Sequence, residues 1–552
     1  MPDTSFLNAA PYHLDNDALA WVESTFDSLN QSERIAQLFC FRSNANDTNE
    51  HEHLMHYQPG GIIRIYGAER DVERARIDRL QAEAKVPMLI AADLEGSRMS
   101  LTYGTQVPNP LALAAIDSEK ITAEISSIMA TEGRDVGVNW SYTPLLDINH
   151  AWRSAIVASR GFGSDPERIL RHALTQIEAF QEHGVAATIK HWPGEGYDDR
   201  DQHLMTTINP LSVDEWHTTF GHLYQTCIDA GCMSVMSAHI AFPAYATLKG
   251  TSGAEVYRPA SISRSINIDL LRGELGFQGV IVSDASEMAG ISSFVPAPQS
   301  KVELLKGGCD VVLMSSDPAT ELAAVAAAVK SGELDKAELD QSVLRVLGLK
   351  AWLGLHKSEP KQPSVDVDYA AHKAAVKKIF PLAPTLVKDT QQLLPINVDK
   401  HRRITIVSSG IVEPLLGTTL PFIVPDLLND EGFEVKMQTK GEPIDTESAD
   451  LVLYLLGEET LLTRGHIFLD WARLTENFRA SMQRTWHEVP TAMISFGYPY
   501  YLYGAPRMPT YINAYATMDD MQRCVVDLLL GRGEWNSNSP VDPFVGAPDA
   551  RY

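Results

Sequence analysis

Short apolar runs alternate with longer helical stretches over the first 350 residues, and this alternation constrains the fold more than any other feature. Eight runs have the length and apolar character of strands: 37–41, 61–66, 87–93, 140–147, 186–192, 233–240, 279–285 and 310–314. Helical segments such as 71–85 and 165–184 lie between most of them. Strands separated by helices indicate parallel βαβ units. We therefore expect a parallel sheet covered by helices.

The number of strands and the placement of polar residues favour a closed barrel over an open doubly wound sheet. Eight βα units are what a (β/α)₈ barrel needs, and such a barrel takes about 250 residues or more. Polar side chains gather at the carboxyl ends of the runs: Asp93, Asp147, Lys190, His191, His239 and Asp284. Barrel enzymes build their sites at that end. We predict an N-terminal TIM-type barrel with its site there.

A second domain is predicted after a linker. Residues 356–380 begin with HKSEPKQPSVDVDYA, a stretch rich in proline, serine and charge that is typical of a linker. We assign residues 1–355 to the barrel and residues 381–552 to a smaller, open α/β sandwich domain. Its apolar runs predict a mostly parallel sheet, and they span 403–410, 433–438, 451–457, 491–497 and 510–516, with a helix at 518–531.

Charge excludes two classes of partner. The net charge is -25 and the pI is about 5.1. Nucleic acid and anionic membranes are bound through lysine and arginine, so we expect neither as a partner. The N-terminus lacks the basic and apolar regions of a signal peptide, and no run of 18 apolar residues occurs. We therefore expect a cytoplasmic protein without a membrane span; its oligomeric state stays open.

Asp284 is the first candidate for chemistry. It ends the apolar run in GFQGVIVSDASEM, directly before a turn of small residues. A partly desolvated carboxylate at the barrel mouth can act as a nucleophile or a general base. The alternative is structural, because Asp284 or Ser286 could cap the following helix. This motif alone does not decide between the two.

The loop KHWPGEGYDDRDQH at 190–203 offers a partner for that carboxylate. Asp201 and His203 are two residues apart, so in an extended segment they project to the same side. The carboxylate can accept the Nδ1–H of the imidazole and leave Nε2 to move a proton. The loop also holds residues that Zn²⁺ or Mn²⁺ accepts, but the spacing of known zinc motifs is missing, so we expect no metal and no cofactor.

The same loop resembles the K-H-F-P-G-H-G-D…D-S-H loop of glycoside hydrolase family 3, in its β-N-acetylhexosaminidase branch. Further matches occur in order along the chain. AADLEGSR at 91–98 is similar to D-Q-E-G-G-R, SRGFGSDP at 159–166 to R-S-F-G-x-D-P, and PTLVKDTQQLLPI at 384–396 to A-L-T-L-L-K-N-x-x-x-L-P-L. The resemblance covers roughly residues 30–540.

The resemblance implies a role for individual residues. Asp284 stands where the family has its catalytic nucleophile, and His203 stands where this branch has its general acid/base, with Asp201 as its dyad partner. Four further residues match positions that bind the hydroxyl groups of the terminal sugar: Asp93, Arg160, Lys190 and His191. The β-glucosidase branch usually lacks the D-x-H loop, so its presence favours the aminosugar branch.

The implied activity is a retaining, exo-acting hydrolysis that releases terminal β-linked N-acetylglucosamine from chitooligosaccharides or peptidoglycan fragments. It proceeds through a covalent glycosyl-enzyme and needs no cofactor. Because a neutral imidazole does not repel an anion, inorganic phosphate could replace water as the acceptor. The alternatives are a β-glucosidase or β-xylosidase of the same family, which accepts a 2-hydroxyl, and a non-catalytic sugar-binding relative.

Several residues depart from the family pattern. Glu195 replaces the histidine of P-G-H-G, Tyr197 replaces an aspartate, Ser97 replaces a glycine, and Gln202 replaces the serine between the dyad residues. Leu101 stands where many bacterial aminosugar enzymes carry a sugar-binding arginine. These departures leave the dyad intact but bear on the choice of substrate.

Overall fold

The computed structural model describes residues 3–44, 48–64, 69–357, 367–414 and 417–552. All eight strands predicted for the first part of the chain are present. They are β1 (Phe39–Ser43), β2 (Gly61–Arg64), β3 (Leu89–Ala92), β4 (Trp140–Ser141), β5 (Ala186–Trp192), β7 (Ser234–Ser237), β9 (Val280–Ser283) and β10 (Val312–Leu313). Several are shorter than predicted: β4 spans only Trp140–Ser141 and β10 only Val312–Leu313.

These strands form one parallel sheet in the order β10-β1-β2-β3-β4-β5-β7-β9. A parallel bridge between Val282 and Val311 brings β9 beside β10 and closes the ring. The N–H of Ser283 donates to the carbonyl of Val311 at 2.9 Å across the same seam. The predicted barrel is therefore confirmed, and the open-sheet alternative is wrong.

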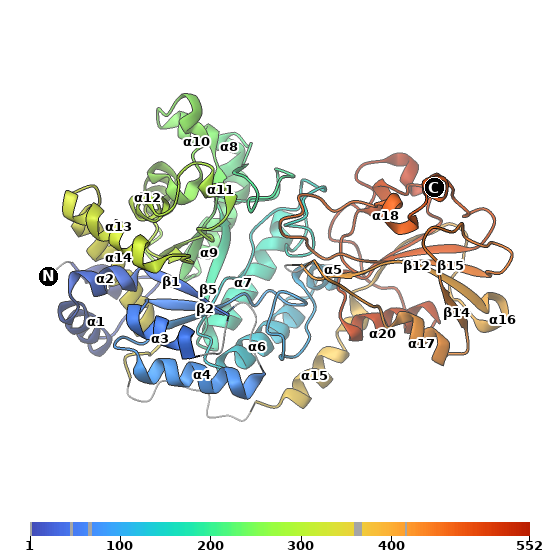
Figure 1. Ribbon diagram of the computed structural model, residues 1–552, viewed down its shortest axis with the longest axis horizontal. Helices are drawn as coiled ribbons and strands as arrows, with labels where there is room; N and C mark the ends of the chain where they lie inside the picture. Colours follow the sequence, from blue (N-terminus) through green and yellow to red (C-terminus); the bar gives the residue numbers. More distant parts are fainter. Residues whose placement is uncertain (1–2, 45–47, 65–68, 358–366, 415–416) are drawn as a thin grey trace.

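Helices surround the barrel and form the connections between its strands (Figure 1). They are α1 (Asn16–Ser28), α2 (Gln31–Gln37), α3 (Thr48–Tyr57), α4 (Arg70–Glu83), α5 (Pro110–Ile116), α6 (Glu119–Asp135), α7 (Pro166–Glu182), α8 (Val213–Trp216), α9 (His222–Asp229), α10 (Pro243–Leu248), α11 (Ala289–Ser292), α12 (Gln299–Lys306), α13 (Pro318–Ser331) and α14 (Lys336–Trp352). Asp317 caps α13 through the N–H of Thr320, and Gly332 ends it with a φ of 80°.

The second part of the chain forms a seven-stranded sheet. Its strands are β11 (Thr385–Asp389), β12 (Arg403–Val412), β13 (Thr419–Leu420), β14 (Glu434–Met437), β15 (Leu451–Gly457), β16 (Thr491–Ser495) and β17 (Thr510–Asn513). The five strands predicted here are present and pair in parallel. Two more, β11 and β13, pair antiparallel with β17 and β12. The mostly parallel open sheet is therefore confirmed, with short antiparallel strands added to it.

Helices α17 (Val424–Asp430) and α20 (Asp519–Leu529) belong to this second part, and the latter matches the predicted closing helix. Three shorter helices are α16 (Val398–His401), α18 (Trp471–Thr475) and α19 (Phe478–Met482). Figure 1 shows the barrel and this sheet side by side along the long axis of the molecule.

The predicted linker contains a helix, α15 (Tyr369–Lys377), which lies between the two parts in Figure 1. Asp368 caps it by accepting the N–H of Ala371 at 2.9 Å. His372 contacts Glu132 of α6 at 2.8 Å between Nδ1 and Oε1. Residues 358–366 of the linker lie outside the described residues. The boundaries 1–355, 356–380 and 381–552 stay a proposal.

A buried carboxylate joins the two parts. Glu459, in the loop after β15, accepts a hydrogen bond from Ser97 Oγ at 2.8 Å and from Asn109 Nδ2 at 3.1 Å, both on the barrel side. It also accepts the N–H of Thr517 at 2.8 Å. Ser97, which replaces the family's glycine, thus serves the contact between the two parts. Because a buried polar group needs hydrogen-bond partners, these bonds hold the loop after β15 against the barrel.

Membrane-spanning helices were sought in the same described ranges. None of the helices found there is both long enough and apolar enough to cross a bilayer.

Candidate active site

A hollow of about 420 Å³ opens among the residues that follow the barrel strands. Six of the seven predicted site residues line it: Asp93, Arg160, Lys190, His191, His203 and Asp284. We call this hollow the catalytic pocket. The seventh, Asp201, is buried and bonds to His203. The carboxyl ends of parallel strands meet at one end of the barrel, which explains why residues nearly 200 positions apart converge.

Asp284 follows β9 directly and is 9% exposed. Its Oδ1 accepts the N–H of the next residue, Ala285, at 2.8 Å. Helix α11 begins only at Ala289, after Met288, so the helix-cap alternative is wrong. Burial alone would raise the pKa of Asp284, but the nearby imidazoles of His191, His239 and His203 outweigh it and lower that pKa. The carboxylate is therefore ionised at neutral pH and faces the pocket.

The predicted contact between Asp201 and His203 is present. His203 Nδ1 lies 2.7 Å from Oδ1 of Asp201, and the backbone N–H of His203 donates to the same oxygen at 2.8 Å. The other oxygen, Oδ2, accepts the backbone N–H of Thr463 at 2.9 Å. Asp201 is 1% exposed, whereas the side chain of His203 is 24% exposed. The carboxylate thus orients the ring and leaves Nε2 as the nitrogen that can exchange a proton.

A buried ion-pair network stands on the other side of the pocket. Lys190 Nζ lies 3.0 Å from Asp93 Oδ1 and 2.7 Å from Glu95 Oε1. Arg160 binds both oxygens of Glu95, each at 2.8 Å. Burial would raise the pKa of Glu95, but Arg160 and Lys190 lower it well below its usual range. Glu95 was not among the predicted site residues, although it lies in the AADLEGSR stretch.

His191 belongs to a second buried cluster. Its Nδ1 lies 2.6 Å from Asp147 Oδ2 and 3.4 Å from Glu195 Oε2. Asp147 Oδ1 accepts the backbone N–H groups of His191 and Glu195, at 3.0 and 3.1 Å. The ligand atoms of the three side chains lie within 4.8 Å of one another, as a metal site would require. Because both oxygens of Asp147 already accept hydrogen bonds, these contacts explain the cluster as a hydrogen-bonded network.

Glu195 differs from Asp147, because only one of its two carboxyl oxygens has a hydrogen-bond partner. Its Oε2 accepts Gln202 Nε2 at 3.1 Å, but its buried Oε1 has no hydrogen-bond partner. Burial, together with the negative charge of Asp147, raises the pKa of Glu195 well above its usual value. Burial therefore favours the neutral form of the Glu195 carboxyl over its charged form. Gln202 also accepts the N–H of His239 at 3.0 Å, so both departures from the family pattern belong to one network.

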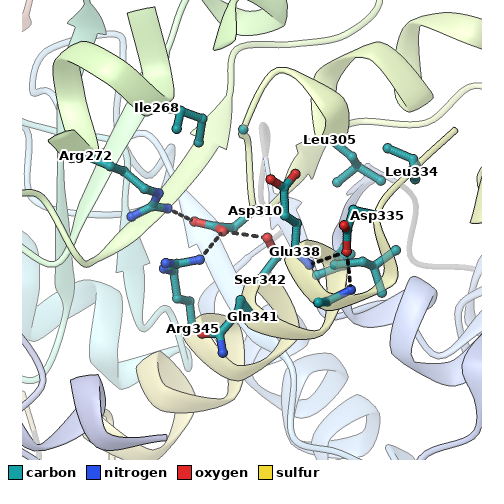
Figure 2. A pocket seen from close by; sticks show the side chains of 14 residues that line it. Ile268, Arg272, Leu305, Asp310, Leu334, Asp335, Glu338, Gln341, Ser342 and Arg345 are labelled. Carbon is teal, nitrogen blue, oxygen red and sulfur yellow. Dashed lines mark hydrogen bonds and ion pairs between the residues drawn. The ribbon is translucent and has the colours of Figure 1, made fainter. Parts of the chain in front are cut away.

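Another hollow, of about 320 Å³, lies at the opposite end of β10 and is drawn in Figure 2. Asp310 precedes that strand. It accepts hydrogen bonds from Arg272 Nη2 at 2.5 Å, Ser342 Oγ at 2.7 Å and Arg345 Nη1 at 3.4 Å. These side chains satisfy one another across the hollow. Polar groups at the amino ends of barrel strands serve stability rather than chemistry.

The second domain supplies part of the catalytic pocket, which sequence reasoning did not foresee. Leu462 and Thr463 line it, together with Arg98 and Glu287 of the barrel. Leu101 does not line the pocket; it lines a smaller hollow beside Tyr103. Leu101 therefore brings no cation into the pocket at the position where many bacterial aminosugar enzymes carry a sugar-binding arginine. Arg98, three residues earlier in the chain, does line the pocket.

The fold and this pocket define the class of protein: a barrel enzyme whose site is completed by a loop of a second domain. Residues 31–349 match the model of the glycosyl hydrolase family 3 N-terminal domain. The chain belongs to this family and is a glycosidase, as the resemblance predicted.

Similar proteins cover the whole chain. One is the "Beta-N-acetylglucosaminidase/beta-glucosidase" of Cellulomonas fimi, 33% identical over 98% of this chain and 99% of the relative. Among solved structures, "Beta-glucoside phosphorylase BglX" is 33% identical with a TM-score of 0.91, over 99% of this chain and 100% of the other. A family 3 β-N-acetylglucosaminidase from Paenibacillus sp. str. FPU-7 has a TM-score of 0.80 at 24% identity, over 94% of this chain and 100% of that one, and shares the fold.

Proposed function

We propose that the protein removes a terminal β-linked N-acetylglucosamine from chitooligosaccharides or peptidoglycan fragments, with retention of configuration. The observation that carries this proposal is the Asp201–His203 dyad, because His203 lines the same pocket as Asp284. The name of the Cellulomonas fimi relative supports the choice of sugar. A cytoplasmic location is part of the proposal.

In the first step, the Asp284 carboxylate attacks the anomeric carbon while the bond to the leaving oxygen breaks. Protonated His203 gives its Nε2 proton to that oxygen, and a covalent glycosyl-enzyme forms. In the second step, neutral His203 takes a proton from water, and the hydroxide oxygen displaces Asp284. Asp201 keeps the Nδ1–H in place through both steps and stabilises the imidazolium that exists before the first step and forms again in the second.

Four side chains hold the sugar ring in this proposal: Asp93, Arg160, Lys190 and His191. Lys190 and Asp93 present charged groups to the hydroxyls. Since Arg160 is engaged with both oxygens of Glu95, its position is fixed before the sugar arrives. A fixed set of donors reduces the entropy lost when the ring binds.

A second candidate function is phosphorolysis of β-glucosides. It is favoured by the full-length match to a β-glucoside phosphorylase at 33% identity. The catalytic pocket also offers cations to an anionic acceptor, because Arg42, Arg98, Arg160 and Lys190 line it beside three carboxylates, those of Asp93, Asp284 and Glu287. A histidine acid/base lacks the permanent negative charge that would repel phosphate.

The test compares kcat/KM for an aryl N-acetyl-β-glucosaminide and an aryl β-glucoside, with and without 10 mM phosphate. We expect turnover of the aminosugar that is lost in Asp284→Ala. A preference for the glucoside, with glucose 1-phosphate as the product, would move the protein to the second candidate. Sugar binding without any turnover would make it a non-catalytic relative.

A further inference from the structure

A second concave surface lies where the two parts of the chain meet, beside the catalytic pocket. Six aromatic side chains line it: Trp152, Phe468, Tyr498, Tyr500, Tyr501 and Tyr503. Its volume is about 420 Å³, the same as that of the catalytic pocket. We call it the aromatic groove. The catalytic mechanism uses none of these residues.

The aromatic groove combines a fixed floor with exposed rings. Tyr498 donates its hydroxyl to the carbonyl of Trp152 at 2.5 Å, and Tyr501 donates to Glu458. By contrast, Phe468 is 62% exposed and Tyr503 is 54% exposed. Exposed aromatic rings held on a rigid floor have little to lose in entropy when a flat, partly apolar ligand lies on them.

Polar groups stand at the edge of these rings. The guanidinium of Arg153 lies 4.3 Å from the ring centroid of Trp152 and donates to the hydroxyl of Tyr503 at 3.2 Å. The rings of Trp152 and Tyr503 lie 4.0 Å apart. This combination suits a ligand with an apolar face and a hydroxylated edge, which is the chemistry of a pyranose ring.

One segment of the second domain runs from the catalytic pocket to the groove. Leu462 and Thr463 line the catalytic pocket, and His466 to Leu469 line the groove. The segment is held along the barrel by a backbone bridge between Ser154 and His466. His466 Nε2 also lies 3.6 Å from Asp199, two residues before the dyad carboxylate Asp201.

A third hollow, more polar than the aromatic groove, borders that groove. It has about 410 Å³ and shares Trp152 and Arg153 with the groove, while its other side is formed by the loop 198–200 that leads to the dyad. His203 is the group that would protonate the departing oxygen, so the rest of a bound substrate has to lie near the loop that carries His203. This loop lines the third hollow, and it meets the groove at the contact between Asp199 and His466.

We propose that the aromatic groove binds the sugar rings of an oligosaccharide beyond the terminal one held in the catalytic pocket. This inference rests on the proposed function for the kind of glycan, and it adds that the preferred substrate is longer than a disaccharide. The sugar rings of the oligosaccharide stack on Trp152, Phe468 and Tyr503, and Arg153 donates hydrogen bonds to the sugar hydroxyls.

The test uses Phe468→Ala and Tyr503→Ala, because both side chains are more than half exposed and their loss leaves the floor intact. The matched control is Phe478→Ala, on a ring that is 80% exposed on α19 and does not line the groove. The kcat/KM values are measured for an aryl monosaccharide and for oligosaccharides of two to five units carrying the preferred terminal sugar.

We expect the wild-type kcat/KM to rise with chain length. Each groove variant should lose about tenfold on the pentasaccharide and less than about twofold on the aryl monosaccharide, since one stacked ring is worth about that much. Equal losses on both substrates, no loss on the pentasaccharide, or the same loss in Phe478→Ala would overturn the proposal. A loss confined to aryl substrates would assign the groove to aromatic aglycones instead and overturn it too.

A binding measurement separates failure of the groove from failure of the proposed function. Calorimetry with Asp284→Ala measures the Kd of the N-acetylglucosamine pentasaccharide, and of the glucose pentasaccharide, without turnover. If one of them binds and added Phe468→Ala weakens it about tenfold, the groove stands even where no hydrolysis is found. If neither binds, or if Phe468→Ala leaves Kd unchanged, the groove proposal is wrong.

Discussion

Thr463 of the second domain donates its backbone N–H to Oδ2 of Asp201 at 2.9 Å, while His203 occupies Oδ1 of the same carboxylate. The dyad is therefore held from both sides, by its own loop and by another domain. Thr463 has a φ of 62°, in the left-handed region that a β-branched residue rarely adopts. Strain of this kind persists where the surroundings impose it, often at functional sites.

Replacing Thr463 by glycine should relieve this strain without removing the N–H. We expect Thr463→Gly to raise the free energy of unfolding by up to about 1 kcal/mol and to change kcat/KM by less than about threefold. Chemical denaturation measures the first quantity. Thr463→Ala is the matched control, because it keeps both the N–H and the strained φ. A glycine variant less stable than the alanine variant would argue against a strained backbone.

Removing the proposed acid/base should affect poor leaving groups most. His203→Ala should slow hydrolysis of an oligosaccharide by about 10²- to 10⁴-fold, but hydrolysis of an activated aryl glycoside much less, because the latter needs no proton. Asp201→Asn should fall between wild type and His203→Ala. Steady-state rates over a series of aryl leaving groups measure this. Equal losses across the series would show that His203 does not act as the acid.

Glu95 should stabilise the folded protein through its ion pairs. Glu95→Gln leaves Arg160 and Lys190 buried with too little negative charge, so we expect a loss of about 3–5 kcal/mol at pH 7. The folded pKa of Glu95 is lowered, so this contribution is present above about pH 4.5 and is lost as the pH falls. Urea denaturation at several pH values measures it. Glu434→Gln, which breaks an exposed pair with Arg402, is the control and should have little effect.

Glu195 should have the opposite pH dependence. Its folded pKa is raised above the unfolded value of about 4.5, so the folded state binds more protons between the two. By linkage, the contribution of Glu195 to stability falls as the pH rises through that range. Glu195→Gln mimics the neutral acid, so its stability advantage over wild type should grow from about pH 4.5 upward. Thermal unfolding of both proteins between pH 4.5 and 8 measures this.

Asp147 and His191 lie against Glu195, and a change of charge on either would act on its carboxyl. The prediction therefore concerns the difference between the two proteins and not the wild-type curve. A difference that stays constant with pH, or shrinks as the pH rises, would mean that Glu195 is ionised in the folded protein.

The barrel could be predicted because its strands are continuous apolar runs that end in polar residues. The same pattern predicted that Asp93, Lys190 and Asp284 meet, since parallel strands share one edge. The strand β11 was not predicted, because it is an antiparallel edge strand in which only Thr385 and Lys388, both polar, are buried. Such a strand leaves no apolar run in the sequence.

Two site residues escaped prediction for different reasons. Glu95 lies two residues beyond Asp93, in a loop whose course the sequence does not give, and its role depends on Arg160 from a distant segment. Thr463 contributes a backbone N–H, which almost any residue can supply, so its identity carries no signal. Contacts made by the main chain between two domains become visible only in the structure.

The central claim is that Asp284 forms the covalent glycosyl-enzyme, and trapping that species tests it most directly. The protein is incubated with an activated 5-fluoro N-acetyl-β-glucosaminide, digested, and analysed by peptide mass spectrometry. We predict that the peptide containing Asp284 carries one added sugar. Prolonged incubation in buffer, or the addition of phosphate, should remove this sugar. A sugar on another residue, or an inverted product with no adduct under any condition, would contradict the account.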